Sequence, residues 1–91
     1  MRLSAADRPR LGKGVRLRRE SAESAMLLVP EGALSLNASA AATLELVDGQ
    51  RSIAEISARL VEFFEVDENQ AREEVCRLLE RLAERRFIVT S

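Results

Sequence analysis

The 91-residue chain contains no histidine, tryptophan or tyrosine, and it has a single cysteine. Without histidine, the Ser-His-Asp and Cys-His systems of nucleophilic enzymes are excluded, as are most zinc sites. The lone Cys76 has no partner for an internal disulfide, which excludes a disulfide-stabilised secreted scaffold. These absences predict a protein that is not an enzyme and that uses no metal or cofactor.

An excess of positive charge and long apolar runs are also missing. Fourteen basic and fifteen acidic residues give a net charge of −1, whereas nucleic-acid binding requires a surplus of positive charge. Residues 1–7 lack the apolar core of a signal peptide, and the apolar run 25–29 is too short to cross a bilayer. We therefore expect a cytoplasmic protein that binds neither nucleic acid nor a membrane.

The first third of the chain has the pattern of short strands. Residues 15–19 alternate apolar and basic side chains, residues 25–29 are apolar throughout, and residues 33–36 alternate again. An uninterrupted apolar run is typical of a central strand that is covered on both faces. The short polar turns between these runs predict an antiparallel meander in chain order.

From Asn37 onward the apolar spacing becomes helical. The predicted N-caps are Asn37, Ser52 (which forms a capping box with Glu55) and Asp67. The first helix is expected to run to Val47 and to end at Asp48-Gly49. The predicted inward faces are Ile53, Ile56, Leu60, Phe63 and Phe64 in the second helix and Ala71, Val75, Leu78, Leu79 and Leu82 in the third. Residues 86–89 are predicted to close the domain as an extended tail.

Neither the strands nor the helices are large enough to bury an apolar face alone. We therefore predict an α+β fold that is winged-helix-like, with a three-stranded antiparallel β-meander followed by a three-helix bundle. The single domain is expected to span residues 8–91, after a flexible N-terminus of residues 1–7.

The two edges of the predicted sheet differ in charge. The first strand carries Arg16, Arg18 and Arg19, which repel incoming chains, whereas residues 33–36 are uncharged. Such an edge is either covered by another segment of the chain or open to a disordered peptide that adds itself as a strand. Each backbone hydrogen bond contributes roughly 0.5–1.5 kcal/mol, against roughly 1–2 kcal/mol for ordering each peptide residue. Apolar peptide side chains in a groove must therefore supply the affinity.

The third helix is the candidate for the second wall of that groove. Cys76 and Ala83 are small, apolar and off the main core stripe, and Leu79 lies between the two faces; Arg72 is a candidate partner for an acidic peptide side chain. The alternative is that these residues pack within the domain. Two other hypotheses are a winged-helix regulator that reads DNA with the third helix, and a homodimer formed by strand exchange. The interleaved glutamates, with i, i+4 pairs such as Glu68–Arg72 and Glu73–Arg77, argue against the first of these.

An ordered set of short motifs resembles the PqqD family. They are Arg8-Pro9-Arg10-Leu11, Gly14-Val15-Arg16-Leu17-Arg18, Leu27-Leu28-Val29-Pro30-Glu31, Leu34-Ser35-Leu36-Asn37, Asp48-Gly49 with Ser52-Ile53-Ala54-Glu55-Ile56, and Leu78-Leu79-Leu82 with Phe87-Ile88. The resemblance covers residues 8–89. One departure is Arg86, where a glycine is expected.

The resemblance implies a peptide chaperone in pyrroloquinoline quinone (PQQ) biosynthesis. Such a protein binds the ribosomal precursor peptide PqqA by β-strand addition and presents it, as a monomer, to the radical S-adenosylmethionine (SAM) enzyme PqqE. Related RiPP recognition elements hold the peptide between the third strand and the third helix. Carried over, the implied site is Ala33, Leu34, Ser35, Leu36, Asn37, Arg72, Cys76, Leu79 and Ala83. The basic edge at Arg16, Arg18 and Arg19 is the candidate surface for the partner enzyme.

Overall fold

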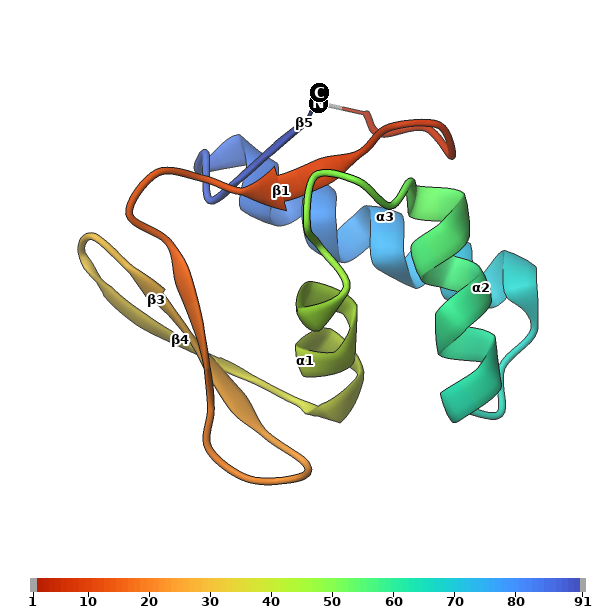
Figure 1. The fold of residues 1–91 in the computed structure, drawn as a ribbon, viewed down its shortest axis with the longest axis horizontal. Coiled ribbons are helices and arrows are strands. Elements are labelled where there is room, and N and C mark those ends of the chain that lie inside the picture. The colour runs from red at the N-terminus through yellow and green to blue at the C-terminus, as the bar shows by residue number, and fades with distance from the viewer. Residues whose placement is uncertain (1, 91) are drawn as a thin grey trace.

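A three-stranded antiparallel sheet forms one side of the molecule (Figure 1). The computed structural model describes residues 2–90. In the sheet, β3 (Ala25–Val29) lies between β2 (Arg16–Arg19) and β4 (Gly32–Leu36), and both pairings are antiparallel. The predicted meander order is confirmed, and β4 lies at one edge of the sheet.

The two faces of this sheet are buried to different extents. On the inner face, the register aligns Leu17, Leu27 and Leu34 across the three strands, and Leu27 is fully buried. On the outer face, Met26 and Leu28 are only half-buried. The prediction of a central strand covered on both faces is therefore wrong, because the helices all lie on the inner side (Figure 1).

Three helices follow the sheet: α1 (Ala38–Glu45), α2 (Ile53–Phe63) and α3 (Glu68–Glu84). All three begin at the predicted caps. The side chains of Asn37, Ser52 and Asp67 accept backbone N–H bonds at 2.9, 3.2 and 2.7 Å. The first helix ends at Glu45, two residues before the predicted end at Val47. Over residues 2–90, no helix combines the length and the apolar composition that crossing a membrane requires.

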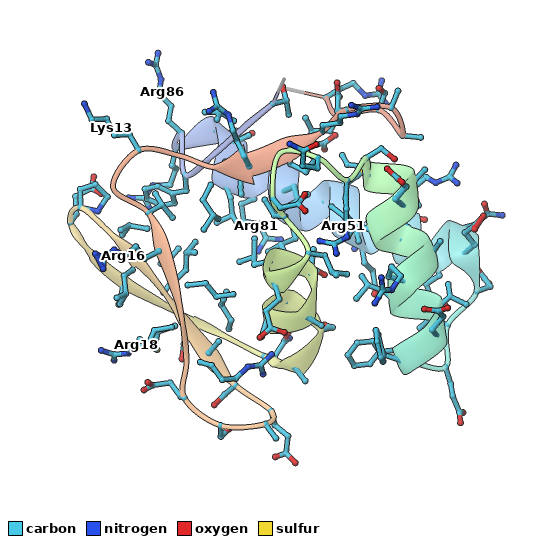
Figure 2. The ribbon with its side chains drawn as sticks, in the orientation of Figure 1. Lys13, Arg16, Arg18, Arg51, Arg81 and Arg86 are labelled. Carbon is cyan, nitrogen blue, oxygen red and sulfur yellow. The ribbon has the colours of Figure 1, made fainter. Side chains whose placement is uncertain are left out.

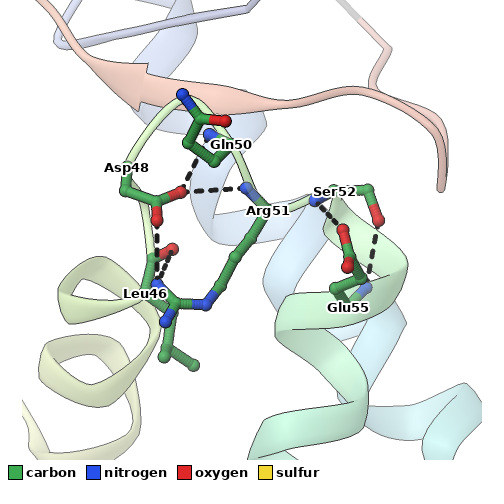
Figure 3. A network of polar contacts seen from close by, with 6 residues as sticks. All are labelled: Leu46, Asp48, Gln50, Arg51, Ser52 and Glu55. Carbon is green, nitrogen blue, oxygen red and sulfur yellow. Dashed lines mark hydrogen bonds and ion pairs between the residues drawn. The ribbon is translucent and has the colours of Figure 1, made fainter.

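Side-chain hydrogen bonds fix the connection between α1 and α2 (Figure 3). Asp48 Oδ1 accepts hydrogen bonds from the backbone N–H groups of Gln50 and Arg51, both at 2.9 Å. The Arg51 guanidinium donates to Asp48 Oδ2 at 3.0 Å. In the capping box, Ser52 N donates to Glu55 Oε1 at 2.8 Å and Glu55 N donates to Ser52 Oγ at 3.2 Å. These hydrogen bonds lower the pKa of both carboxyl groups.

The core lies between the sheet and the helices. Most of the predicted inward residues of α2 and α3 are buried: Ile53, Ile56, Leu60, Ala71, Val75, Leu79 and Leu82. Leu78 and Phe64 are half-buried against this core. The prediction is wrong for Phe63, whose side chain in the last turn of α2 is 65% exposed.

A second, two-stranded sheet joins the two ends of the described chain. The extended tail expected at residues 86–89 is confirmed for its second half, because β5 (Ile88–Thr90) begins after the turn and bend at Arg86-Phe87 and pairs antiparallel with β1 (Pro9–Leu11). β1 was not predicted, because three residues that include a proline show no usable alternation. After β1, Gly12 N donates to Phe87 O at 2.8 Å, and a Cβ at Gly12 would lie 2.3 Å from Arg86 O. Only glycine fits there without displacing the backbone.

The C-terminus of α3 explains the departure at Arg86. Arg86 N donates to Ala83 O at 2.9 Å and Phe87 N donates to Leu82 O at 3.0 Å, the two bonds of a Schellman motif. This motif places Arg86 in the left-handed region, at a φ of 63°. The family's expected glycine would adopt this conformation without strain. Arg86 occupies it with its side chain directed into solvent (Figure 2).

The N-terminal segment, which the sequence predicts to be flexible, is described from residue 2 onward and lies against the helices. Residues 2–7 pack across α2 and α3. Leu3 is buried, its N–H donates to Glu80 Oε2 at 2.8 Å, and its carbonyl accepts the Cys76 thiol at 3.8 Å. Ile53 N donates to Asp7 O at 2.9 Å. This segment therefore covers one flank of α3.

Candidate functional site

The outer edge of β4 is unpaired over the part of the chain that the structure describes. The two-residue turn at Pro30-Glu31 makes Val29 and Gly32 a hydrogen-bonded pair, and such pairs then alternate along the ladder. Leu34 and Leu36 therefore direct their backbone groups toward β3. Ala33 and Ser35 direct theirs toward the open edge, where a further strand would bind.

A cavity of about 250 Å³ lies at the end of this edge. Its lining comes from the β4–α1 junction and from the facing helices: Asn37, Ser39, Ala40, Thr43, Leu60, Glu74, Val75, Arg77, Leu78 and Arg81. The strand edge leads into it, because Asn37 directly follows the last residue of β4. An extended peptide paired with β4 would therefore pass the mouth of the cavity.

The cavity combines apolar side chains with charged ones. Ala40, Leu60, Val75 and Leu78 supply apolar surface, and all four are buried or half-buried. Arg81, which lies beside α1 in Figure 2, is exposed and forms no ion pair or side-chain hydrogen bond with other residues between 2 and 90. The lining also holds Glu74 and Arg77, the latter paired with Glu73, so the site suits an apolar side chain with polar or charged groups beside it.

The helical wall that the sequence predicts lies on the other flank of α3. At about 100° per residue, Leu78 and Arg81 fall on one side of Val75, and Cys76 and Ala83 fall on the opposite side. The first two line the cavity, whereas the Cys76 thiol contacts Leu3 O. The structure therefore does not bring Cys76 and Ala83 together with β4.

The two remaining helical residues of the predicted site also stand apart from the cavity. Leu79 is fully buried, and Arg72 lies 3.6 Å from Glu68, in an i, i+4 ion pair. The helical pattern identified which face of α3 packs inward. The helical pattern does not indicate which flank of α3 faces β4. The opposite flank is covered by the N-terminal segment, and that segment has no recognisable periodicity in the sequence. Residues 33–37 lie along and just after the edge strand β4, whereas Arg72, Cys76, Leu79 and Ala83 do not line the cavity beside it.

The chemistry of Cys76 is that of a packed thiol. Burial raises its pKa, the neighbouring Glu80 carboxylate raises it further, and Arg72 opposes the rise. The reactive thiolate is therefore disfavoured at neutral pH. Among residues 2–90, no three histidine, cysteine, aspartate or glutamate side chains gather in a way that would hold a metal ion.

The basic edge on β2 is partly neutralised by the chain itself. Arg18 Nε lies 3.1 Å from Glu20 Oε2, and Arg19 is paired with Glu45 while it donates to two carbonyl oxygens of the following turn. Arg16 forms no such contact within the described residues, and it projects away from the helices (Figure 2). The charge available to a partner is thus smaller than the sequence suggests.

The ion pairs expected along α3 are present. Glu68 and Arg72 lie 3.6 Å apart, and Glu73 and Arg77 lie 3.1 Å apart. Each arginine is balanced by an acid one turn earlier, so this part of α3 presents little net positive charge.

The fold and the site define a class: small α+β modules with an open strand edge beside a helix. The family model for coenzyme PQQ synthesis protein D (PqqD) matches residues 24–88. A PqqA binding protein from Azotobacter vinelandii is 46% identical over 83 residues, which cover 90% of this chain and 89% of that relative. The chain belongs to the PqqD family, as its motifs indicated.

Solved structures agree with this assignment. The solution structure of the PqqD part of Methylobacterium extorquens PqqCD, a functional and stand-alone RiPP recognition element, matches with a TM-score of 0.82 and 33% identity, and the match covers 96% of this chain and 94% of that one. The heterocyclase TruD matches with a TM-score of 0.66 and 17% identity, over 93% of this chain and 12% of that one. The second likeness concerns the fold alone. The predicted α+β fold class is confirmed.

Proposed function

We propose that this chain binds the precursor peptide PqqA by β-strand addition and presents it to PqqE during PQQ biosynthesis. The observation that carries the proposal is the unpaired outer edge of β4, which leads into the cavity against α3. Membership in a family whose relatives include PqqA binding proteins supports the identity of the peptide.

In this mechanism the strand and the cavity have separate roles. Leu34 and Leu36 hold β4 against the core, while the backbone groups of Ala33 and Ser35 pair with the peptide. The ladder sets register, because its hydrogen bonds about offset the ordering of the peptide. One apolar peptide side chain buried in the cavity adds roughly 1.5–3 kcal/mol.

The residues on α3 divide accordingly. Leu78 forms the apolar wall, and Arg81 binds a peptide carboxylate at the border of the cavity. Leu79 and Ala83 contribute from behind, since their burial in the core fixes the position of the helix. Cys76 and Arg72 lie on the flank near the N-terminal segment and do not contact the peptide in this mechanism.

The chain itself carries out no chemistry in this proposal. It acts as a monomer in the cytoplasm, where the ribosomally made peptide is available. By holding the peptide, it lowers the entropic cost of bringing the reacting side chains to the active site of PqqE.

Amide-shift mapping by NMR with purified PqqA tests the peptide site. We expect the largest shifts at Ala33, Ser35, Asn37 and Leu78, with Cys76 as the internal control on the far flank of α3. Larger shifts around Cys76 than around Leu78 would mean that the peptide binds on the Cys76 flank of α3. An unchanged spectrum with saturating PqqA would contradict peptide binding altogether.

Self-pairing of the edge is the outcome to separate from peptide binding. Two copies that exchange or pair β4 edges would also shift Ala33 and Ser35, but the shifts would depend on protein concentration. Light scattering across the same concentrations, with and without PqqA, distinguishes the two, because peptide and second copy compete for one edge.

A further inference from the structure

Unpaired basic side chains gather where the turn after β1 meets the C-terminal end of α3. Residues 8–19 contain six basic side chains and no acidic one. A Cβ placed on Gly12 in this segment would lie 2.3 Å from Arg86 O, and Gly12 N donates to Phe87 O at 2.8 Å. Lys13 follows Gly12 directly, so its backbone lies beside that of Arg86.

Arg16 belongs to the same group of residues. Val15 N donates to Gly12 O at 3.1 Å, which closes a tight turn and places the start of β2 next to it. Figure 2 shows Lys13 and Arg86 directed into solvent from one corner of the molecule, with Arg16 along the same side. All three side chains are exposed. We call Lys13, Arg16 and Arg86 together the basic corner.

The charges of the basic corner are not balanced within the chain. Ion pairs with acidic side chains occupy six other arginines: Arg18, Arg19, Arg51, Arg59, Arg72 and Arg77. Between residues 2 and 90, Lys13, Arg16 and Arg86 form no such pair. Within the same residues, Glu31 in the β3–β4 turn and Glu84 in the last turn of α3 do not pair with them either. Like charges that gather without counter-charges repel one another and destabilise the fold.

Arg86 occupies a backbone position that favours glycine. Its φ of 63° lies in the left-handed region, where an arginine is strained and a glycine is not. Its side chain projects into solvent and forms no hydrogen bond or ion pair with residues 2–90. A strained residue whose side chain the surrounding fold does not use points to a role in binding. Arg86 thus supplies a surface charge while it lowers the stability of the fold.

The chemistry of the basic corner selects an acidic protein surface. Arg85, whose guanidinium lies 5.1 Å from the centroid of the Phe87 ring, adds a fourth positive charge beside the corner, against the two acids Glu31 and Glu84. A nucleic acid would require many phosphate contacts, and the whole chain has a net charge of −1. A small local excess of positive charge fits carboxylates that cluster on the surface of a protein.

We propose that the basic corner docks the chain onto an acidic surface of the enzyme that receives the peptide. This inference rests on the proposed function, in which that enzyme is PqqE. Arg16 lies on β2 and the peptide site lies on β4, at opposite edges of the three-stranded sheet, so peptide and enzyme can bind at once. The inference narrows the candidate surface on β2, because Arg18 and Arg19 are already paired within the chain.

Titration of purified PqqE against variants of the full chain tests the inference. Arg86→Gly is the sharpest variant, because it should raise the melting temperature and yet weaken PqqE binding by roughly two- to five-fold, the contribution of one exposed ion pair. Lys13→Glu and Arg16→Glu each reverse a charge and are expected to weaken PqqE binding roughly five-fold or more. PqqA affinity should not change in any of the three. The PqqE affinity of the wild type should fall as the salt concentration rises, and a constant affinity would contradict docking through charge.

Arg59→Glu is the matched control, because it changes the net charge of the chain as much as Arg16→Glu does but lies on α2. It is expected to leave PqqE affinity unchanged. An equal loss with both variants would overturn the inference, since the overall charge and not the corner would then govern binding. Unchanged PqqE affinity in Arg86→Gly and Arg16→Glu would overturn it as well.

The remaining outcomes separate this inference from the proposed function. PqqA binding without any PqqE binding overturns the inference, while peptide capture stands. PqqE binding that depends on the basic corner, without PqqA binding, overturns the proposed peptide function and leaves the docking surface intact. A loss of PqqA affinity in the corner variants would assign the corner to the peptide, and corner-dependent binding of a random DNA duplex in place of PqqE would assign it to nucleic acid; either result overturns the inference.

Discussion

Replacing Ser35 with proline removes one outward-facing N–H from the open edge of β4 and leaves the ladder to β3 intact. The register places Ser35 opposite Met26 in a non-hydrogen-bonded pair, so its N–H is free for an incoming strand. Proline is tolerated on edge strands where the N–H would face solvent. We therefore expect Ser35→Pro to remain folded, with a melting temperature close to that of the wild type.

The expected loss of PqqA affinity follows from the same geometry. The peptide carbonyl opposite residue 35 would lose its donor and remain desolvated, which costs about 1–3 kcal/mol. This corresponds to roughly a 5- to 150-fold increase in Kd. The matched control is Ser35→Ala, which removes the hydroxyl but keeps the amide, and it should bind as the wild type does. Isothermal titration with PqqA measures both. A folded Ser35→Pro variant with unchanged Kd would refute strand addition at this residue.

Three further predictions concern the cavity and the local structure. Ala40→Phe should fill the cavity and weaken PqqA binding about ten-fold or more in a titration; unchanged affinity would mean that no peptide side chain enters it. Arg86→Gly should raise the free energy of unfolding by about 0.5–1 kcal/mol in chemical denaturation, because it relieves the left-handed strain. The control is Arg85→Gly. Arg85 has a φ of −101°, so glycine relieves no strain there and should lower the free energy of unfolding. The pKa values of Asp48 and Glu55 are lower in the folded protein than their ordinary values of 3.8 and 4.5. The two carboxylates therefore stabilise the fold at a pH above those ordinary values. This stabilisation is lost as the pH falls through the pKa values of the folded state. Asp48→Asn should therefore show a smaller loss of stability on acidification than the wild type, and an equal loss would contradict this assignment.

Local signals in the sequence predicted much of the fold. Caps at Asn37, Ser52 and Asp67 depend on side chains that bond to the backbone three residues away, so they can be predicted without knowledge of the tertiary structure. The uncharged strand at residues 33–36 likewise identified the open edge. These features are determined within a few neighbouring residues.

The rest depends on contacts between residues far apart in the chain. The pairing of β1 with β5 joins residues near opposite ends, and three residues carry too short a pattern to predict it. The N-terminal segment covers Cys76 through Leu3, which determines the flank of α3 left for the cavity. Phe63 fits the helical period of the core face, and it is exposed because the chain leaves the helix directly after it.

Amide hydrogen exchange along β4 is the most direct test of peptide binding by strand addition. In the free protein, Leu34 and Leu36 should be protected by their bonds to β3, whereas Ala33 and Ser35 should exchange rapidly. On addition of PqqA, we expect new protection at Ala33 and Ser35, with little change at Leu34 and Leu36. Continued rapid exchange at both residues, in a sample saturated with bound peptide, would contradict strand addition.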